Sequence, residues 1–282
     1  MKKNIVTAVE FLVLLMIGIC VFVVFSHMRP VLNRNADIVG RFLLSVLLLV
    51  SALLARRTNN HKKYWKILFA FFIAILTISV DYYTPSSRLL IPFSQNHLQT
   101  PAGIALDKLG SSIIIIGGIV VLTIISGEKL SSLFLYDGNV RESLKIGTVA
   151  FSIVAFGSVL IAKLFGAQDL SLERIIPWLP WILIFIAGNA LNEELLFRGL
   201  FFKKLEPVLG GFLSNLVVAI PFVLHHTGVT YTNDVFMFLS YLLPLSLLWG
   251  YITQKTGSLW GAVLFHAGTD IPVVLVIFSK LA

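Results

Sequence analysis

Cysteine and charged residues are both scarce in this chain of 282 residues. Cys20 is the only cysteine, so no disulfide can form within the chain. It lies among Ile, Val and Phe with no histidine beside it, which predicts an apolar packing residue and not a nucleophile. Charged types make up only 13% and apolar types 57%, whereas soluble domains are about a quarter charged. These proportions predict an integral membrane protein.

Several sequence features that would indicate other protein classes are also missing. No long polar segment could fold as a separate soluble domain, and no repeat or inverted half of the transporter kind is present. The net charge of +8 is spread over many positions and not gathered in one basic arm. This distribution favours cytoplasmic loops and a lipid bilayer as the partner, not nucleic acid. The G-x-S-x-G and H-E-x-x-H patterns are absent, which excludes two common hydrolase sites.

Long apolar runs dominate what is present, and a membrane span needs about 20 mostly apolar residues. The predicted fold is therefore an all-α, polytopic transmembrane helical bundle. The alternative to nine spans is eight, because one run is short. The first run is too long for a signal peptide and is expected to remain as a helix. The predicted spans are 4–26, 37–55, 64–83, 111–126, 147–165, 178–203, 214–228, 235–253 and 258–279.

Lysine and arginine predict the orientation of these spans. The most basic connection, around residues 55–63, is expected in the cytoplasm, which places the N-terminus there as well. Residues 84–110 and the C-terminus are then expected outside. Charges mixed with Leu and Phe over residues 128–147 predict a short amphipathic helix at the cytoplasmic interface. The chain is thus predicted to be a multi-pass protein of a bacterial plasma membrane.

Ionisable residues inside the predicted spans gather in the last third of the chain, and such residues are functional candidates by default. Glu194 and Arg198 are four residues apart, so they share a helix face and can form an ion pair. Glu193 lies about 100° further round the helix and need not share that partner. His266 and Asp270 also have a spacing of four residues.

Three of these side chains are predicted to lie at similar depth in the membrane. At about 1.5 Å per residue, Glu193, His226 and His266 lie roughly 16, 18 and 12 Å from the predicted cytoplasmic ends of their helices. We therefore expect them to meet in an intramembrane cavity that faces the cytoplasm. Asn189, one turn before Glu193, is a further candidate for its wall, whereas His225 is expected to be a packing residue.

A carboxylate and two imidazoles support hydrolysis by activated water. Glutamate can take a proton from water that a histidine orients, and a second histidine can stabilise a developing oxyanion. The same side chains are also suitable ligands for zinc, which is the alternative cofactor. Neither reading requires a serine or cysteine nucleophile.

Three short motifs carry a family resemblance. EELLFR matches E-E-x-x-x-R, FVLHH at 222–226 matches F-x-x-x-H, and HAGTD at 266–270 matches H-x-x-x-[N/D]. In this order, each on its own predicted helix, they resemble the CAAX prenyl protease and bacteriocin-processing (CPBP, or abortive-infection-like) family of intramembrane endopeptidases. The resemblance covers about residues 127–275. We accordingly divide one integrated membrane domain into N-terminal helices without a signature, 1–126, and a catalytic helical core, 127–282.

The resemblance implies a role for each matching residue. Glu193 and His226 would activate the water, while His266 and the residue at position 270 would stabilise the oxyanion. Glu194 and Arg198 would support the shape of the site. If the enzyme requires metal, its ligands would be Glu193, His226, His266 and Asp270.

Position 270 departs from the family, which usually has asparagine there, because this chain has Asp270. An ionised aspartate cannot donate to an oxyanion. Three alternatives follow for this residue: it is kept protonated, it orients His266, or it binds a metal ion.

The function implied is that of an intramembrane endopeptidase. Its substrate would be a peptide precursor, such as a bacteriocin or signalling peptide, or a membrane-tethered protein. The principal alternative is a non-enzymatic protein of the same fold that acts in bacteriocin self-immunity or as a scaffold. A proton-coupled transporter is a third hypothesis, which would require access from both sides of the membrane.

Overall fold

The computed structural model describes residues 2–26, 28–84, 97–232 and 234–281, and within these ranges the protein consists of helices and their connections, with no β-strand. Nine helical stretches in the described ranges are long and apolar enough to cross a membrane, in agreement with the predicted all-α bundle. The spans are α1 (Lys2–Ile19) with its π-helical extension η1 (Cys20–Val24), α2 (Arg34–Arg57), α3 (Trp65–Tyr83), α5 (Pro101–Ile125), α6 (Val140–Leu164), α7 (Leu172–Glu194) continued by η5 (Leu195–Gly199) and α8 (Leu200–Leu209), α9 (Gly211–His225) with η6 (His226–Gly228), α10 (Val235–Thr256) and α11 (Trp260–Ser279).

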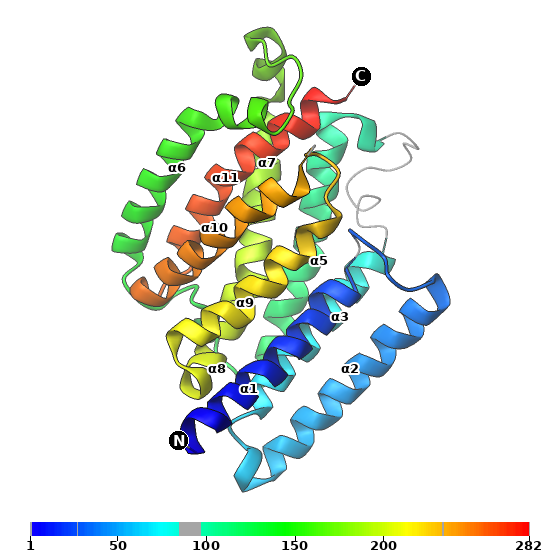
Figure 1. The fold of residues 1–282 in the computed structure, drawn as a ribbon, viewed down its shortest axis with the longest axis vertical. Coiled ribbons are helices and arrows are strands. Elements are labelled where there is room, and N and C mark those ends of the chain that lie inside the picture. The colour runs from blue at the N-terminus through cyan, green and yellow to red at the C-terminus, as the bar shows by residue number, and fades with distance from the viewer. Residues whose placement is uncertain (1, 27, 85–96, 233, 282) are drawn as a thin grey trace.

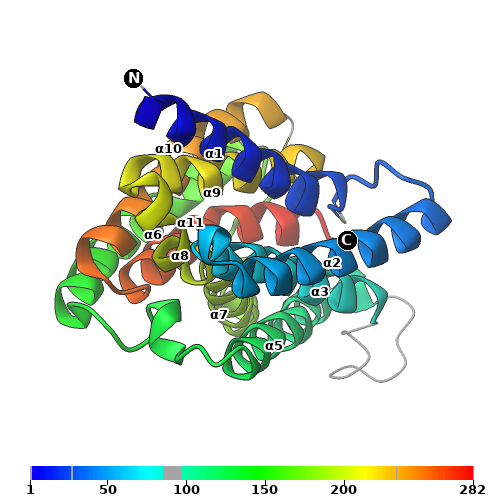
Figure 2. The same ribbon diagram turned by 90° about the horizontal axis from the view of Figure 1, so that it is seen from below.

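Successive spans run in opposite directions, and the two termini lie at opposite ends of the bundle (Figure 1). Helix α11 is central, because it packs against α6, α7 and α10. Helix α2 lies at the edge, beside α3, in both views (Figures 1 and 2). The helices that carry the three motifs therefore lie inside the bundle, while part of the N-terminal third forms one flank.

The span predicted at 111–126 begins earlier than expected, at Pro101. Helix α5 starts at Pro101, whose N-terminal cap is Thr100, and the Thr100 hydroxyl accepts a hydrogen bond from the Gly103 amide at 3.1 Å. Proline at the first helical position and a threonine cap are strong start signals. Residues 101–110, predicted to belong to an outer connection, are thus helical, and residues 85–96 of that connection lie outside the described residues.

The prediction of an amphipathic helix over residues 128–147 is wrong. The chain instead forms one short 3-10 helix, η4 (Leu130–Leu133), and then turns through Phe134 and Gly138, which both have positive φ angles. Asn139 caps the next helix, since its side chain accepts a hydrogen bond from the Glu142 amide at 3.0 Å. The left-handed residues and this cap break the segment before an amphipathic helix could form.

Small residues let α6 and α11 approach closely. The Ser143 hydroxyl on α6 accepts a hydrogen bond from the Gly261 amide on α11 at 2.7 Å. A Cβ atom at Gly261 would collide with the Ser143 backbone, and one at Gly147 would collide with Gly261. Close helix approach through small residues is a common packing mode in membranes. It holds α11, the helix of His266, at a fixed distance from α6.

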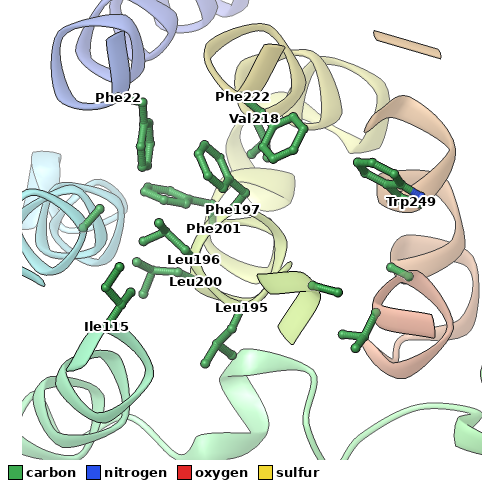
Figure 3. Close-up of a cluster of buried hydrophobic side chains, with 14 of the residues drawn as sticks. Phe22, Ile115, Leu195, Leu196, Phe197, Leu200, Phe201, Val218, Phe222 and Trp249 are labelled. Atoms are coloured by element: carbon green, nitrogen blue, oxygen red, sulfur yellow. The ribbon is translucent and has the colours of Figure 1, made fainter. Parts of the chain in front are cut away.

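A layer of buried aromatic side chains fills the bundle between Glu193 and the end that carries the N-terminus. We call Phe22, Phe197, Phe201, Phe222 and Trp249 the aromatic layer (Figure 3). The Phe22 and Phe197 ring centroids are 4.4 Å apart, and those of Phe197 and Phe222 are 4.9 Å apart. Because Phe197 and Phe201 follow Glu193 along the same continuous helix, the layer packs directly beneath the site.

Candidate active site

The first motif lies where α7 passes into the π-helical turn η5. Glu194 ends α7 and Arg198 lies in η5, and both side chains are 0% exposed. The Arg198 Nη1 atom donates to Glu194 Oε1 at 2.8 Å, so the predicted ion pair is present. Arg198 Nη2 also donates to the hydroxyl of Ser246 on α10 at 2.6 Å. This ion pair therefore ties α7 to α10 as well as bridging one turn of its own helix.

Glu194 has a second partner that the sequence did not reveal. Its Oε1 atom lies 2.7 Å from Nδ1 of His266, on α11. Because the same oxygen accepts from Arg198, the shared carboxylate acts as acceptor and the His266 Nδ1–H donates. Glu194 thus links the arginine to the histidine of the third motif. No spacing along the sequence relates residues 194 and 266, which lie on separate helices.

The two motif histidines present the same ring nitrogen to Glu193. His226 Nδ1 lies 2.8 Å from the carbonyl oxygen of Phe222, which can only accept, so Nδ1 carries the proton. Its Nε2 atom lies 4.0 Å from Glu193 Oε2, and His266 Nε2 lies 3.5 Å from the same oxygen. The structure therefore brings together the three side chains whose convergence the depth estimate predicted.

Trp249 fixes the second imidazole and was not identified from the sequence. Its ring stacks on that of His266, with centroids 4.0 Å apart and an interplanar angle of 5°. Trp249 is almost fully buried on α10, and the Arg198 guanidinium lies 5.2 Å from its centroid. With Nδ1 bonded to Glu194 and one face covered by indole, the His266 ring has a single orientation.

Asp270 lies one turn beyond His266 on α11, as its spacing predicted. Its Oδ1 atom is 3.6 Å from His266 Nε2, and its Oδ2 atom accepts a hydrogen bond from Asn189 Nδ2 at 3.0 Å. Asn189 is buried and lines the same cavity, so the candidate from α7 does belong to the wall. His225, by contrast, turns toward η1, where its Nδ1 lies 2.8 Å from the Phe22 carbonyl oxygen.

The site residues line a cavity of about 570 Å³ whose walls are mainly apolar. We call it the main cavity. Two of its lining side chains, Leu164 at the end of α6 and Tyr241 on α10, are also exposed, so the main cavity reaches the surface between these helices. Met28, Phe165 and Tyr231 line it at the end of the bundle opposite the N-terminus. None of its described lining residues comes from the connections at the N-terminal end.

The predicted cytoplasmic-facing cavity stays a prediction, and this direction links it to the predicted orientation of the N-terminus. If the N-terminus is cytoplasmic, as the basic connections predict, the main cavity extends toward the opposite side, so the two predictions exclude each other. The depth estimate measured distances from one helix end only and could not show which end is filled by side chains. The aromatic layer packs on the side of Glu193 nearer the N-terminal end, because Phe197 and Phe201 follow Glu193 toward α8.

Tyr231 adds a neutral hydroxyl to the wall near the surface. It lies in the connection between α9 and α10 and packs edge-on against Phe238, with centroids 5.4 Å apart. Burial raises the pKa of Tyr231 well above its ordinary value, and the carboxylates of Glu193 and Asp270 act in the same direction. The phenol therefore remains a hydrogen-bond donor at neutral pH.

The arrangement does not fit the alternative of a zinc site. In the part of the chain that the structure describes, no three or more His, Cys, Asp or Glu side chains are grouped so that they could hold one metal ion. We therefore derive no catalytic step through a metal.

Comparison with known proteins agrees with the three motifs. No curated protein and no solved structure matches the chain. The segment 175–272, which carries every predicted site residue, matches the family model described as type II CAAX prenyl endopeptidase Rce1-like. This is a family of proteases with membrane-embedded helices, in keeping with the nine apolar helices found in the described ranges. The family resemblance inferred from the motifs is thereby confirmed over residues 175–272, which match the Rce1-like type II CAAX prenyl endopeptidases.

Proposed function

We propose that the protein is an intramembrane endopeptidase that hydrolyses a peptide bond with water activated by Glu193 and His226. The observation that carries the proposal is the approach of Glu193 Oε2 to the Nε2 atoms of His226 and His266, at 4.0 and 3.5 Å, on the wall of the main cavity. The substrate is a peptide precursor or a membrane-tethered protein whose apolar segment occupies this cavity.

The distance between Glu193 and His226 suits one bridging water. A water that donates both hydrogens over about 2.8 Å joins acceptors that are about 4.4 Å apart. Glu193 Oε2 and His226 Nε2 are 4.0 Å apart, and His226 Nε2 is an acceptor because Nδ1 donates to Phe222. A water held by both atoms has its lone pairs directed away from them, toward the cavity.

Hydrolysis then proceeds with balanced protons. The water oxygen attacks the scissile carbonyl carbon, and its proton passes to the Glu193 carboxylate. His266, as imidazolium, donates Nε2–H to the oxyanion, while Glu194 accepts its Nδ1–H at 2.7 Å. When the carbon–nitrogen bond breaks, Glu193 returns the proton to the leaving amine. The products are one new carboxylate and one new amine.

Glu194, Arg198 and Trp249 act as positioning residues in this scheme. Glu194 and Trp249 hold the His266 ring by a hydrogen bond and by stacking. Arg198 balances the charge of Glu194 and connects it to α10 through Ser246. Asp270, held by Asn189, lies beside His266 Nε2 and contributes to the orientation of that ring.

The test compares Glu193→Gln with Glu173→Gln, a matched change at the exposed start of the same helix. Each protein is reconstituted in lipid vesicles with a library of apolar peptides, and new termini are identified by mass spectrometry. We expect Glu193→Gln to lower cleavage by about 100-fold or more and Glu173→Gln to leave it unchanged. Full cleavage by folded Glu193→Gln protein would reject the proposal.

The same variants test the non-enzymatic alternative. If the protein protects cells against a bacteriocin, protection that survives both Glu193→Gln and His226→Ala would assign it to immunity without catalysis. Loss of both protection and cleavage in the two variants supports the endopeptidase.

A further inference from the structure

A second cavity, of about 370 Å³, lies on the other side of Glu193 from the substrate-sized main cavity. Its lining residues come from η1, α3, α5, α7, η5, the end of α9 and the residues that follow η1 and α3. Three residues, Met28, Lys108 and Glu193, line both cavities. The catalytic carboxylate therefore stands in the partition between them. We call this second space the polar chamber, and its polar lining residues are Asp81, Thr84, Asp107, Lys108, Ser111, Asn192, Glu193 and His225.

The chemistry of the two spaces differs. The polar chamber contains carboxylates, an ammonium group, hydroxyls and an amide, whereas the walls of the main cavity are mainly apolar. Ser111 anchors part of this lining, because its hydroxyl donates to Asp81 Oδ2 at 2.7 Å. A space of this size with several polar groups is suited to ordered water, while a dry cavity is lined by apolar groups.

Two buried oxygen atoms, Asn192 Oδ1 on the chamber wall and Glu193 Oε2 in the partition between the two cavities, point to the same occupant. Asn192 is 5% exposed and Glu193 is 9% exposed, and both line the chamber. Neither Asn192 Oδ1 nor Glu193 Oε2 has a hydrogen-bond partner among the residues that the structure describes. Buried polar atoms in folded proteins are paired, and where protein groups do not pair them an ordered water does.

The proposed hydrolysis requires a supply of water at Glu193. Each peptide bond hydrolysed consumes one water, and an apolar substrate segment that fills the main cavity excludes water from that side. We propose, on the basis of the endopeptidase function above, that the polar chamber is a separate water-binding site that supplies the hydrolytic water to Glu193. Asn192, adjacent to Glu193 in the first motif, is a positioning residue for that water.

The occupancy of the chamber can be measured without any protease assay. Cys20 is the only native cysteine, so Cys20→Ala provides a background without thiols. In this background, Ser111→Cys faces the chamber, and Ile113→Cys, two residues away on α5, is exposed on the outer surface of the bundle. A charged methanethiosulfonate reagent attacks only hydrated thiolates.

We expect the thiol at position 111 to react with this reagent at least about tenfold faster than the thiol at position 113 in protein reconstituted in phospholipid vesicles. Equal or slower reaction at position 111 would overturn the proposal of a hydrated chamber. This result is independent of catalysis, so it stands apart from a failure of the proposed function itself.

A second experiment tests whether the chamber feeds the reaction. Ile115 lines the chamber and not the main cavity, so Ile115→Phe fills the chamber, and Ile113→Phe is the matched control on the outer surface. We expect Ile115→Phe to lower kcat about tenfold or more with KM unchanged, since water delivery and not substrate binding is impaired. Leu245→Phe, in the main cavity, is expected to raise KM.

An unchanged kcat in folded Ile115→Phe protein, or a raised KM with unchanged kcat, would overturn the assignment. If Ile115→Phe does not fold, Ser111→Val and Ser111→Thr replace it, because these two side chains have nearly the same shape and Thr alone keeps the chamber hydroxyl. We then expect kcat to fall in Ser111→Val and to be restored in Ser111→Thr. Equal kcat values in these two variants would likewise refute the proposal.

Discussion

Removal of Arg198 tests the interaction that connects the first motif to the rest of the site. In Arg198→Leu, the Glu194 carboxylate loses a 2.8 Å ion pair within a fully buried environment, because both side chains are 0% exposed. The Ser246 hydroxyl and carbonyl on α10 lose their hydrogen bonds to Arg198 as well. The change leaves the buried Glu194 carboxylate without its arginine and with the hydrogen bond from His266.

The expected loss of stability is about 3–5 kcal/mol, the range measured when one partner of a buried ion pair is removed. Most of this cost comes from the remaining charge and not from the lost attraction. The double variant Arg198→Leu/Glu194→Gln removes that charge while a neutral amide still accepts from His266. We therefore expect it to be more stable than Arg198→Leu alone, by about half of that loss or more.

The measurement is equilibrium unfolding in mixed micelles of a mild detergent and dodecyl sulfate, followed by tryptophan fluorescence. Arg141→Leu, at the exposed start of α6, is the control and should change stability by less than about 0.5 kcal/mol. A loss of stability below about 1 kcal/mol for Arg198→Leu would equal that expected for an exposed ion pair and would contradict the prediction. A double variant no more stable than the single one would show that the uncompensated charge is not the cause.

The remaining predictions concern packing, ring orientation, charge and metal. Gly261→Ala should destabilise the fold by about 1–3 kcal/mol in the same unfolding measurement, since its Cβ collides with the Ser143 backbone; an unchanged midpoint would contradict the close contact of α6 and α11. Trp249→Leu should lower kcat more than it raises KM, because the His266 ring loses its stacking partner; an effect on KM alone would count against this role. Asp270→Asn should keep the Asn189 hydrogen bond and retain activity, since an amide can donate to an oxyanion; a tenfold loss, roughly, would show that the charge is required. Treatment with a chelator should leave kcat unchanged, because no metal-binding group is arranged within the described ranges; a loss that zinc restores would refute the metal-free scheme.

Spacing along single helices was enough to predict several parts of the site. The Glu194–Arg198 ion pair and the proximity of His266 to Asp270 both follow from the four-residue repeat of a helix. The rotation of about 100° between adjacent residues also separated Glu193 from Glu194: they approach different ring nitrogens of His266, and the ion pair with Arg198 is made by Glu194. These are local properties that a helix has in any surroundings.

Contacts between helices could not be predicted in the same way. The hydrogen bond from His266 to Glu194 and the stacking of Trp249 on His266 depend on how α7, α10 and α11 cross. The early start of α5 at Pro101 was missed because Asp107 and Lys108 interrupt the apolar run, although the Thr100–Pro101 pair was a readable signal.

The sequence by itself determined the class of the protein, most of its apolar helices, the family resemblance and the residues that are candidates for chemistry. Composition and helical periodicity act locally, and hydrocarbon permits few folds in which backbone groups are all satisfied. Only the tertiary structure decided on which side of Glu193 the aromatic layer packs, toward which end the main cavity extends, and that Glu193 separates it from a polar chamber. These features arise from side chains of helices distant in the sequence, whose packing no single segment specifies.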